Sequence, residues 1–259
     1  RQYVDDQGLV DYAALRENQQ VLDRFILGIS RLEMSTYRLW TQSEQEAFWI
    51  NVYNALLLKV ATDFYPISPE LPNPEYPSDS VRQLGDVFTK SSIEVLGGTV
   101  TPEKIEKNVL RDNFKDPRVH VALVCAAKGC PPLRKEPYRG EQLNQQLNEQ
   151  LKRISEDPKY ILIQRDERRV NLSELFKWYR EEYVDLYGTS EAPERSNKND
   201  AAVLNYFMSV LSNEDQAFLT EGKYGVLYMP YDWSLNDQRT APKALPTPIS
   251  STNNIDARP

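Results

Sequence analysis

The chain has 259 residues, a formal net charge of −7, a hydrophobic fraction of 40% and a charged fraction of 27%. This length is near the upper limit for one hydrophobic core, so we expect a single domain over residues 1–236. A polar C-terminal extension, rich in Pro, Ser and Thr, is expected over residues 237–259. The composition excludes a disordered chain, and the acidic excess with scattered Lys and Arg excludes a surface for nucleic acid. The longest uncharged run, 47–58, is too short for a membrane span, which predicts a soluble protein.

The first elements in chain order are a hairpin or extended arm and an amphipathic helix. Short β-prone pieces flank Gly8 between Tyr3 and Tyr12, which indicates a turn. Apolar residues then recur at three- and four-residue steps from 21 to 32, which predicts a helix with one buried face. The chain starts at Arg1 without an initiator Met. We therefore lean towards an exported or periplasmic protein whose leader has been removed.

The strongest helix signal starts at Ser43. Ser43 and Glu46 match the S-x-x-E capping box, and an apolar stretch follows that should run to about residue 64. Because three turns of this helix carry no charge, it should be buried on most sides. Asn51 and Asn54 on it must then find hydrogen bonds inside the protein, and we treat both as candidate binding residues.

The remaining elements indicate a helix-rich α+β protein. The apolar segment 119–125 predicts a central strand that is covered on both faces. The other expected strands are 93–100 as a hairpin about Gly97 and Gly98, 160–163, 168–170 and 224–229. The other expected helices begin at 101 and cover 140–154, 172–184, 201–211 and 214–221, with loops at 66–80 and 188–199. We expect the helices to pack on a small central sheet that is mixed or antiparallel.

Several sequence blocks together resemble one known family. They are Glu46-Ala-Phe-Trp-Ile-Asn-Val-Tyr-Asn-Ala55, Ile105-Glu-Lys-Asn-Val-Leu-Arg111, Asp116-Pro-Arg-Val-His120 continuing to Cys125, Cys130-Pro-Pro-Leu133, Phe176-Lys-Trp-Tyr179 and Tyr231-Asp-Trp-Ser-Leu-Asn236. As a set they are specific, and the chain resembles the domain of unknown function 547 family over roughly residues 1–236.

Candidate chemistry concentrates between residues 118 and 132. His120 is the only histidine, and Cys125 and Cys130 are the only cysteines. A thiol nucleophile needs a base to deprotonate it, so any Cys-His mechanism must use His120. If 119–125 is one strand, His120 and Cys125 face opposite sides of it. Cys130 follows a segment that can turn at Gly129, so it is the better nucleophile and Cys125 the second candidate.

Several other side chains could complete a site. Glu46 is a candidate for orienting the imidazole, although the capping box accounts for it equally well. Cations at 128, 134 and 135 favour a thiolate at Cys130. Arg118 and Arg134 are candidate binding residues, together with the two asparagines above. A zinc site from His120, both cysteines and Glu46 would have enough ligands, but their spacing matches no familiar pattern. We expect neither a metal nor a cofactor.

Two functional hypotheses follow. The first is a thiol-dependent, peptidase-like hydrolase that acts on a peptide or small amide, with Cys130 as nucleophile, His120 as base and Glu46 as orienting group. In papain-like and transglutaminase-like enzymes the cysteine precedes the histidine, so the likeness here would be a permuted one. The second is a non-catalytic protein- or ligand-binding module in which Cys125 and Cys130 form a structural or redox-sensitive pair, with a disulfide between them sterically allowed.

Overall fold

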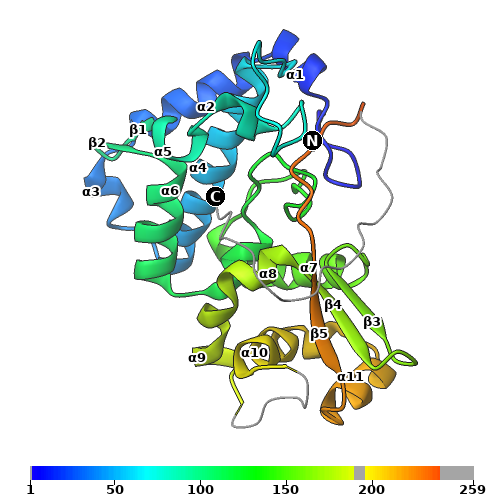
Figure 1. Ribbon diagram of the computed structural model, residues 1–259. Coiled ribbons are helices and arrows are strands. Elements are labelled where there is room, and N and C mark those ends of the chain that lie inside the picture. Colours follow the sequence, from blue (N-terminus) through cyan, green and yellow to red (C-terminus); the bar gives the residue numbers. More distant parts are fainter. Residues whose placement is uncertain (1, 190–195, 240–259) are drawn as a thin grey trace. The chain divides into compact units, whose positions relative to one another are not determined.

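The computed structural model describes residues 2–189 and 196–239 (Figure 1). These residues form two compact units. Unit 1 holds the chain up to Leu147 and takes it up again from Asp232, and unit 2 holds the chain from Asn148 to Tyr231. Most of the predicted extension, from residue 240 on, lies outside the described residues, as do residues 190–195 of the predicted loop. The helix-rich α+β class is confirmed, with one two-stranded and one three-stranded sheet.

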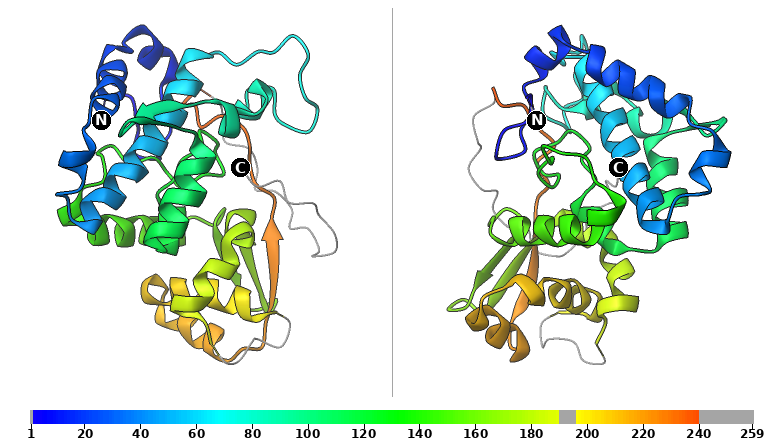
Figure 2. Two further views of the ribbon diagram at one scale, coloured as in Figure 1. Left: turned by 90° about the vertical axis from the view of Figure 1, so that its left-hand side faces the viewer. Right: turned by 180° about the vertical axis from the view of Figure 1, so that it is seen from behind.

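Unit 1 is built around the long helix α4 (Gln42–Asp63), whose side chains are buried on most sides as predicted. Helices α1, α2, α6, η2 and η4 pack against it, and Figure 2 shows this arrangement from two further directions. The helices of unit 1 are α1 (Tyr12–Glu17), α2 (Gln20–Ser30), α3 (Met34–Tyr37), α4, η1 (Val81–Leu84), α5 (Val87–Lys90), α6 (Pro102–Lys104), the π-helix η2 (Ile105–Phe114), η3 (Pro117–Val121) and η4 (Gly140–Gln142). Strands β1 (Ile93–Val95) and β2 (Gly98–Val100) form the predicted hairpin.

The N-terminus of α4 differs from the prediction. Thr41, not Ser43, is the capping residue: its hydroxyl accepts from the Glu44 backbone N at 3.3 Å, and Glu44 Oε2 accepts from the Thr41 backbone N at 2.7 Å. Both sequence pairs fit the capping pattern, and the helix begins at the earlier one. Glu46 is therefore not a capping residue but a buried side chain in the first half of the helix.

The predicted strand 119–125 is wrong. Asp116 caps the short 3₁₀ helix η3, because its side chain accepts from the Arg118 backbone N at 2.9 Å and Pro117 occupies the first turn. After η3 the chain pairs with a side chain instead of a strand. Asn54 Nδ2 donates to Ala122 O at 2.9 Å, and Val124 N donates to Asn54 Oδ1 at 2.8 Å. The apolar residues of segment 119–125 therefore indicate that it is buried, and not that it pairs with a neighbouring strand.

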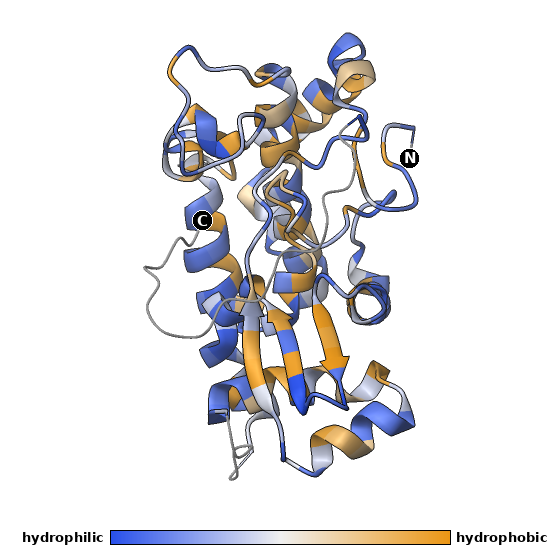
Figure 3. Ribbon diagram, turned by 45° about the vertical axis from the view of Figure 1, so that its right-hand side comes forward, coloured by the Kyte–Doolittle hydropathy of each residue, from blue (hydrophilic) through white to orange (hydrophobic). Residues whose placement is uncertain are grey.

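Unit 2 contains a three-stranded sheet that is mixed, which is one of the two alternatives that were predicted. Strand β3 (Ile161–Gln164) is antiparallel to β4 (Arg169–Ser173), which is parallel to β5 (Gly225–Met229). Strands β3 and β5 are largely hydrophobic, whereas β4 alternates between polar and apolar residues (Figure 3). The helices of this unit are α8 (Glu174–Tyr179), η5 (Arg180–Tyr183), α9 (Val184–Tyr187), α10 (Lys198–Phe207), η6 (Met208–Val210) and α11 (Asn213–Thr220). Helix α7 (Leu143–Ser155) starts in unit 1 and ends in unit 2.

Candidate functional site

A tight turn in unit 1 brings the two cysteines together. The backbone N of Cys130 donates to Ala127 O at 3.1 Å, which closes the turn. The backbone N–H of Cys125 donates to Cys130 Sγ at 2.9 Å. Both side chains are thiols and not a disulfide, and they are only 5% and 3% exposed. The chain thus turns back between Ala127 and Cys130 and aims a backbone donor at the sulfur of Cys130.

The C-terminal segment of unit 1 holds this turn in place. Ala127 pairs with Leu235 in an antiparallel bridge, and Asn236 N donates to Ala126 O at 3.1 Å. Two further backbone donors at 128 and 129 bind the carbonyls of 234 and 232, each at 2.8 Å. Ala126 has a φ of +63°, a left-handed conformation that costs free energy for a residue with a side chain. These backbone hydrogen bonds hold the turn in place despite the strained conformation of Ala126.

Helix α4 fixes the chain on both sides of the cysteine turn. Asn54 binds the backbone of 122 and 124, just before Cys125. Asn51 makes the equivalent pair of bonds after Cys130: its Nδ2 donates to Tyr138 O at 2.8 Å, and Tyr138 N donates to its Oδ1 at 2.9 Å. Both amides are occupied by backbone groups. The structure therefore gives these two candidate binding residues a positioning role within the protein.

Glu46 carries the most unusual carboxylate of unit 1. Its side chain is 6% exposed, and Oε1 has no hydrogen-bond partner among the described residues. Burial raises the pKa of Glu46 from 4.5 to about 7; the negative charge of Asp116 adds to the rise, and Arg118 opposes it. A buried acid with an unsatisfied oxygen and a pKa near neutrality is typical of functional sites.

The 3₁₀ helix η3 carries His120 and the charged pair beside Glu46. His120 is buried at 2% exposure. Arg118 binds Asp116 through two nitrogens, with Nη2 at 2.6 Å from Oδ2, and also donates to Asn144 Oδ1 at 2.8 Å. Because His120 lies on a helical turn, the parity argument that set it opposite Cys125 on a strand no longer applies.

The cations near Cys130 are engaged by acids. Lys135 forms an ion pair with Asp6 at 2.5 Å. Arg134 forms one with Glu136 at 2.6 Å and also donates to the backbone carbonyl of Gln146 at 3.3 Å. These two cations therefore favour a thiolate less than their number in the sequence indicates. The N–H of Cys125 is the more direct support.

A second set of polar residues lies beside the thiols and was not predicted from the sequence. Tyr12 is fully buried, and its hydroxyl donates to Asn236 Oδ1 at 2.6 Å. Burial raises its pKa well above the ordinary value; the charge of Cys130 is the next cause, followed by those of Asp237 and Cys125. The phenol oxygen therefore lies within electrostatic reach of both sulfurs. Asn236 ends a motif that carries the family resemblance, which is the one signal that could have drawn attention to it.

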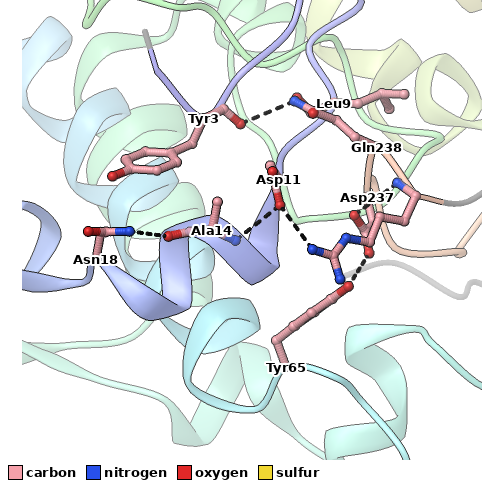
Figure 4. Close-up of polar contacts among 9 residues, drawn as sticks. Tyr3, Leu9, Asp11, Ala14, Asn18, Tyr65, Asp237 and Gln238 are labelled. Carbon is pink, nitrogen blue, oxygen red and sulfur yellow. Dashed lines mark hydrogen bonds and ion pairs between the residues drawn. The ribbon is translucent and has the colours of Figure 1, made fainter.

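Two further parts of unit 1 contact residues around the cysteine turn: Tyr65, which follows helix α4, and the N-terminal hairpin. The hydroxyl of Tyr65 donates to Asp237 Oδ2 at 2.7 Å (Figure 4). The ring of Tyr65 stacks on that of Tyr12, with centroids 5.8 Å apart. The N-terminal hairpin reaches the segment after Cys130, because a Cβ added at Gly8 would lie 2.6 Å from Pro132 Cβ. A hairpin was one of the two predicted alternatives for this segment, whereas its contact with the segment after Cys130 was not predicted.

Residues 37–153 match the family model described as "Protein of unknown function, DUF547". The chain resembles this family over that segment, which is shorter than the range 1–236 over which the sequence blocks were recognised. The match includes Glu46, His120 and both cysteines, and it ends before Asn236. No curated protein and no solved structure matches the chain.

Two classes of site are not found in the part of the chain that the structure describes. No three His, Cys, Asp or Glu side chains of residues 2–189 and 196–239 gather as metal ligands would. Over the same residues, no helix has the length and apolar character to cross a membrane.

Proposed function

We propose that the chain is a thiol-dependent, peptidase-like hydrolase that acts on a peptide or other small amide. Cys130 is the nucleophile, His120 the base and Glu46 the group that orients the imidazole. The observation that carries the proposal is the backbone N–H of Cys125 aimed at Cys130 Sγ at 2.9 Å. A fixed donor at the sulfur stabilises the thiolate, which is the form that attacks a carbonyl.

The two cysteines have different roles in this proposal. The sulfur of Cys130 receives the hydrogen bond, whereas Cys125 contributes its backbone N–H. Serine at position 125 keeps that backbone donor, so the side chain of Cys125 is expected to be dispensable. Serine at position 130 removes the nucleophile.

The reaction follows from these assignments. His120 takes the proton of the Cys130 thiol, and the thiolate forms a C–S bond with the amide carbonyl carbon, which moves an electron pair onto the oxygen. Collapse of this intermediate breaks the C–N bond, and the amine leaves with the proton from His120. Water, deprotonated by His120, then hydrolyses the thioester and returns the thiol. Glu46, with a pKa of about 7, is partly ionised near neutral pH and can stabilise the protonated imidazole.

A second function is favoured by a different observation. Both thiols are almost fully buried, and the backbone on either side of them is fixed by the side-chain amides at 51 and 54. These features suit a non-catalytic binding module in which Cys125 and Cys130 are a structural or redox-sensitive pair.

The pH dependence of alkylation separates the two functions. Iodoacetamide modification of Cys130, followed by peptide mass spectrometry, gives a rate profile whose midpoint reports the thiol pKa independently of how accessible the thiol is. For the hydrolase, the midpoint of the wild-type protein and of Cys125→Ser lies at least about one unit below the ~8.5 of an ordinary cysteine. His120→Ala should move it back towards that value. An ordinary midpoint in the wild-type protein contradicts the hydrolase and leaves the binding module.

A further inference from the structure

The proposed hydrolase needs a donor for the carbonyl oxygen, which becomes negatively charged when the thiolate attacks. Such donors are fixed before the reaction and are among the largest contributions to catalysis. The backbone N–H of Cys125 is directed at the sulfur, so at least one other donor is required. We propose that the side-chain amide of Asn236 is that donor, with Nδ2 binding the oxyanion. This inference rests on the proposed function.

Asn236 is held from three directions. Its backbone N donates to Ala126 O at 3.1 Å, and its backbone O accepts from Val10 N at 2.9 Å. Its side-chain Oδ1 accepts the hydroxyl proton of Tyr12 at 2.6 Å. Because both the backbone and Oδ1 are fixed, the plane of the amide and the direction of Nδ2 are fixed as well. A donor that is already oriented needs no rearrangement when charge develops.

The Nδ2 group of Asn236 has two N–H donors available. The structure records no hydrogen bond from it to residues 2–189 or 196–239, although the residue is only 4% exposed. Nδ2 itself is not fully shielded from solvent. Its N–H groups can therefore bind an oxygen of the substrate that displaces this solvent.

The amide of Asn236 also lies beside the cysteine turn. Through its backbone bond it is attached to the residue that follows Cys125. Tyr12, whose hydroxyl touches Asn236 Oδ1, has its ionisation opposed by the charge of Cys130 more than by that of Asp237. The neighbouring Asp237 cannot take the role, because a carboxylate only accepts hydrogen bonds and already accepts from Tyr65 and from the Arg239 backbone N.

Tyr12 is a positioning residue in this scheme, because it touches the amide and not the substrate. Tyr65 provides a matched control. The hydroxyl of Tyr65 donates to Asp237 (Figure 4). Its ring stacks on that of Tyr12, but it makes no bond to Asn236 that would hold the amide. Removing one hydroxyl releases the proposed donor, and removing the other does not.

Two reagents test the proposal on the same thiol. Acylation of Cys130 by p-nitrophenyl acetate passes through an oxyanion, whereas alkylation by iodoacetamide at a saturated carbon does not. We expect Asn236→Asp, which keeps the acceptor for Tyr12 but lacks the donor, to slow acylation by about 10²–10³-fold. Both reactions are measured above the alkylation midpoint of each variant, so that the charge added by the aspartate does not alter the thiolate fraction. Alkylation should then stay within about threefold of wild type. Tyr12→Phe should slow acylation by roughly tenfold, a smaller loss because the amide is freed and not removed, and Tyr65→Phe should leave both rates unchanged.

Each alternative outcome is distinct. Equal losses in both reactions mean that Asn236 only supports the cysteine turn, and unchanged acylation means that it contacts no oxyanion; either result overturns the inference while the hydrolase stands. An unactivated thiol in the wild-type protein overturns both. If Asn236→Asp does not fold, the ratio of acylation rate to alkylation rate is compared between Tyr12→Phe and Tyr65→Phe. A lower ratio in Tyr12→Phe alone supports the proposal, and equal ratios overturn it.

Discussion

Two buried acids, one in each unit, show how differently this chain treats carboxylates. Asp200 in unit 2 is 4% exposed and Glu46 in unit 1 is 6% exposed. The oxygens of Asp200 accept from Asn197 Nδ2 at 2.9 Å, Ser196 Oγ at 3.1 Å and Arg180 Nη1 at 3.2 Å, and also from the hydroxyl of Tyr228. Glu46 Oε1 has no such partner among the described residues.

The comparison separates a structural acid from a functional candidate. Burial and the negative charge of Asp200 raise the pKa of Tyr228, so the phenol stays protonated and keeps donating to the carboxylate. That network is complete and needs nothing further. A carboxylate that is buried and incompletely bonded, like Glu46, lowers stability near neutral pH, and such a group is typically retained for binding or chemistry.

The largest expected effect is on the complete network. Asp200→Asn keeps the size of the side chain but replaces one acceptor oxygen with a donor that faces Ser196 and Asn197. We expect the free energy of unfolding to fall by roughly 4 kcal/mol, because several buried hydrogen bonds lose their acceptor together. Urea unfolding followed by circular dichroism measures this loss. The alkylation midpoint of Cys130 should not move in the folded variant; a shift there, or a loss below about 1 kcal/mol, contradicts the structural role.

Glu46→Gln should act in the opposite direction above neutral pH. Since the folded-state pKa is about 7 and the ordinary value 4.5, the contribution of Glu46 to stability is fully present below pH 4.5 and is lost as pH rises through 7. Glutamine does not titrate, so the variant should lack this decline and be more stable than wild type by up to about 3 kcal/mol above pH 7. Unfolding free energies measured across that pH window test the prediction.

Glu44→Gln is the matched control on the same helix. Glu44 is exposed and caps α4, and its hydrogen bonds with Thr41 lower its pKa. Its contribution is therefore present at neutral pH and lost as pH falls, which is the reverse of Glu46. If the unfolding free energies of both variants change with pH in the same direction relative to wild type, Glu46 does not have the raised pKa of a buried acid without hydrogen-bond partners.

The sequence predicted the parts of the fold that depend on local patterns. The buried helix α4, the hairpin about Gly97 and the three strands of unit 2 follow from capping, turn and periodicity signals, whereas the parallel pairing of β4 with β5 does not. The segment 119–125 was mistaken for a strand because its apolar residues indicate burial, and burial here comes with hydrogen bonds to Asn54. The position of Glu46 was misread because two capping patterns overlap.

The candidate site was only half accessible to sequence reasoning. His120, Cys125 and Cys130 stand out because each is scarce in the chain. The pairing of Tyr12 with Asn236 joins residues 224 positions apart, and no local pattern specifies which buried tyrosine meets which amide. The bond from the Cys125 backbone to Cys130 Sγ occurs in a turn where Ala126 is left-handed. Alanine rarely adopts this conformation, so the sequence does not predict it.

The smallest expected effect tests whether the surroundings of Cys130 are as rigid as those of Asp200. Gly8 has a φ of +82°, and a Cβ there would lie 2.6 Å from Pro132 Cβ; Gly97 has a φ of +79° and open space around it. Gly8→Ala and Gly97→Ala should each lower stability by about 1–2 kcal/mol through backbone strain. Only Gly8→Ala also pushes the N-terminal hairpin off the segment after Cys130, so it alone should raise the alkylation rate of this buried thiol severalfold. Equal rates in the two variants would mean that the cysteine turn is held as tightly as the Asp200 network, so that burial of the thiol is structural and the binding module becomes the better reading of the chain.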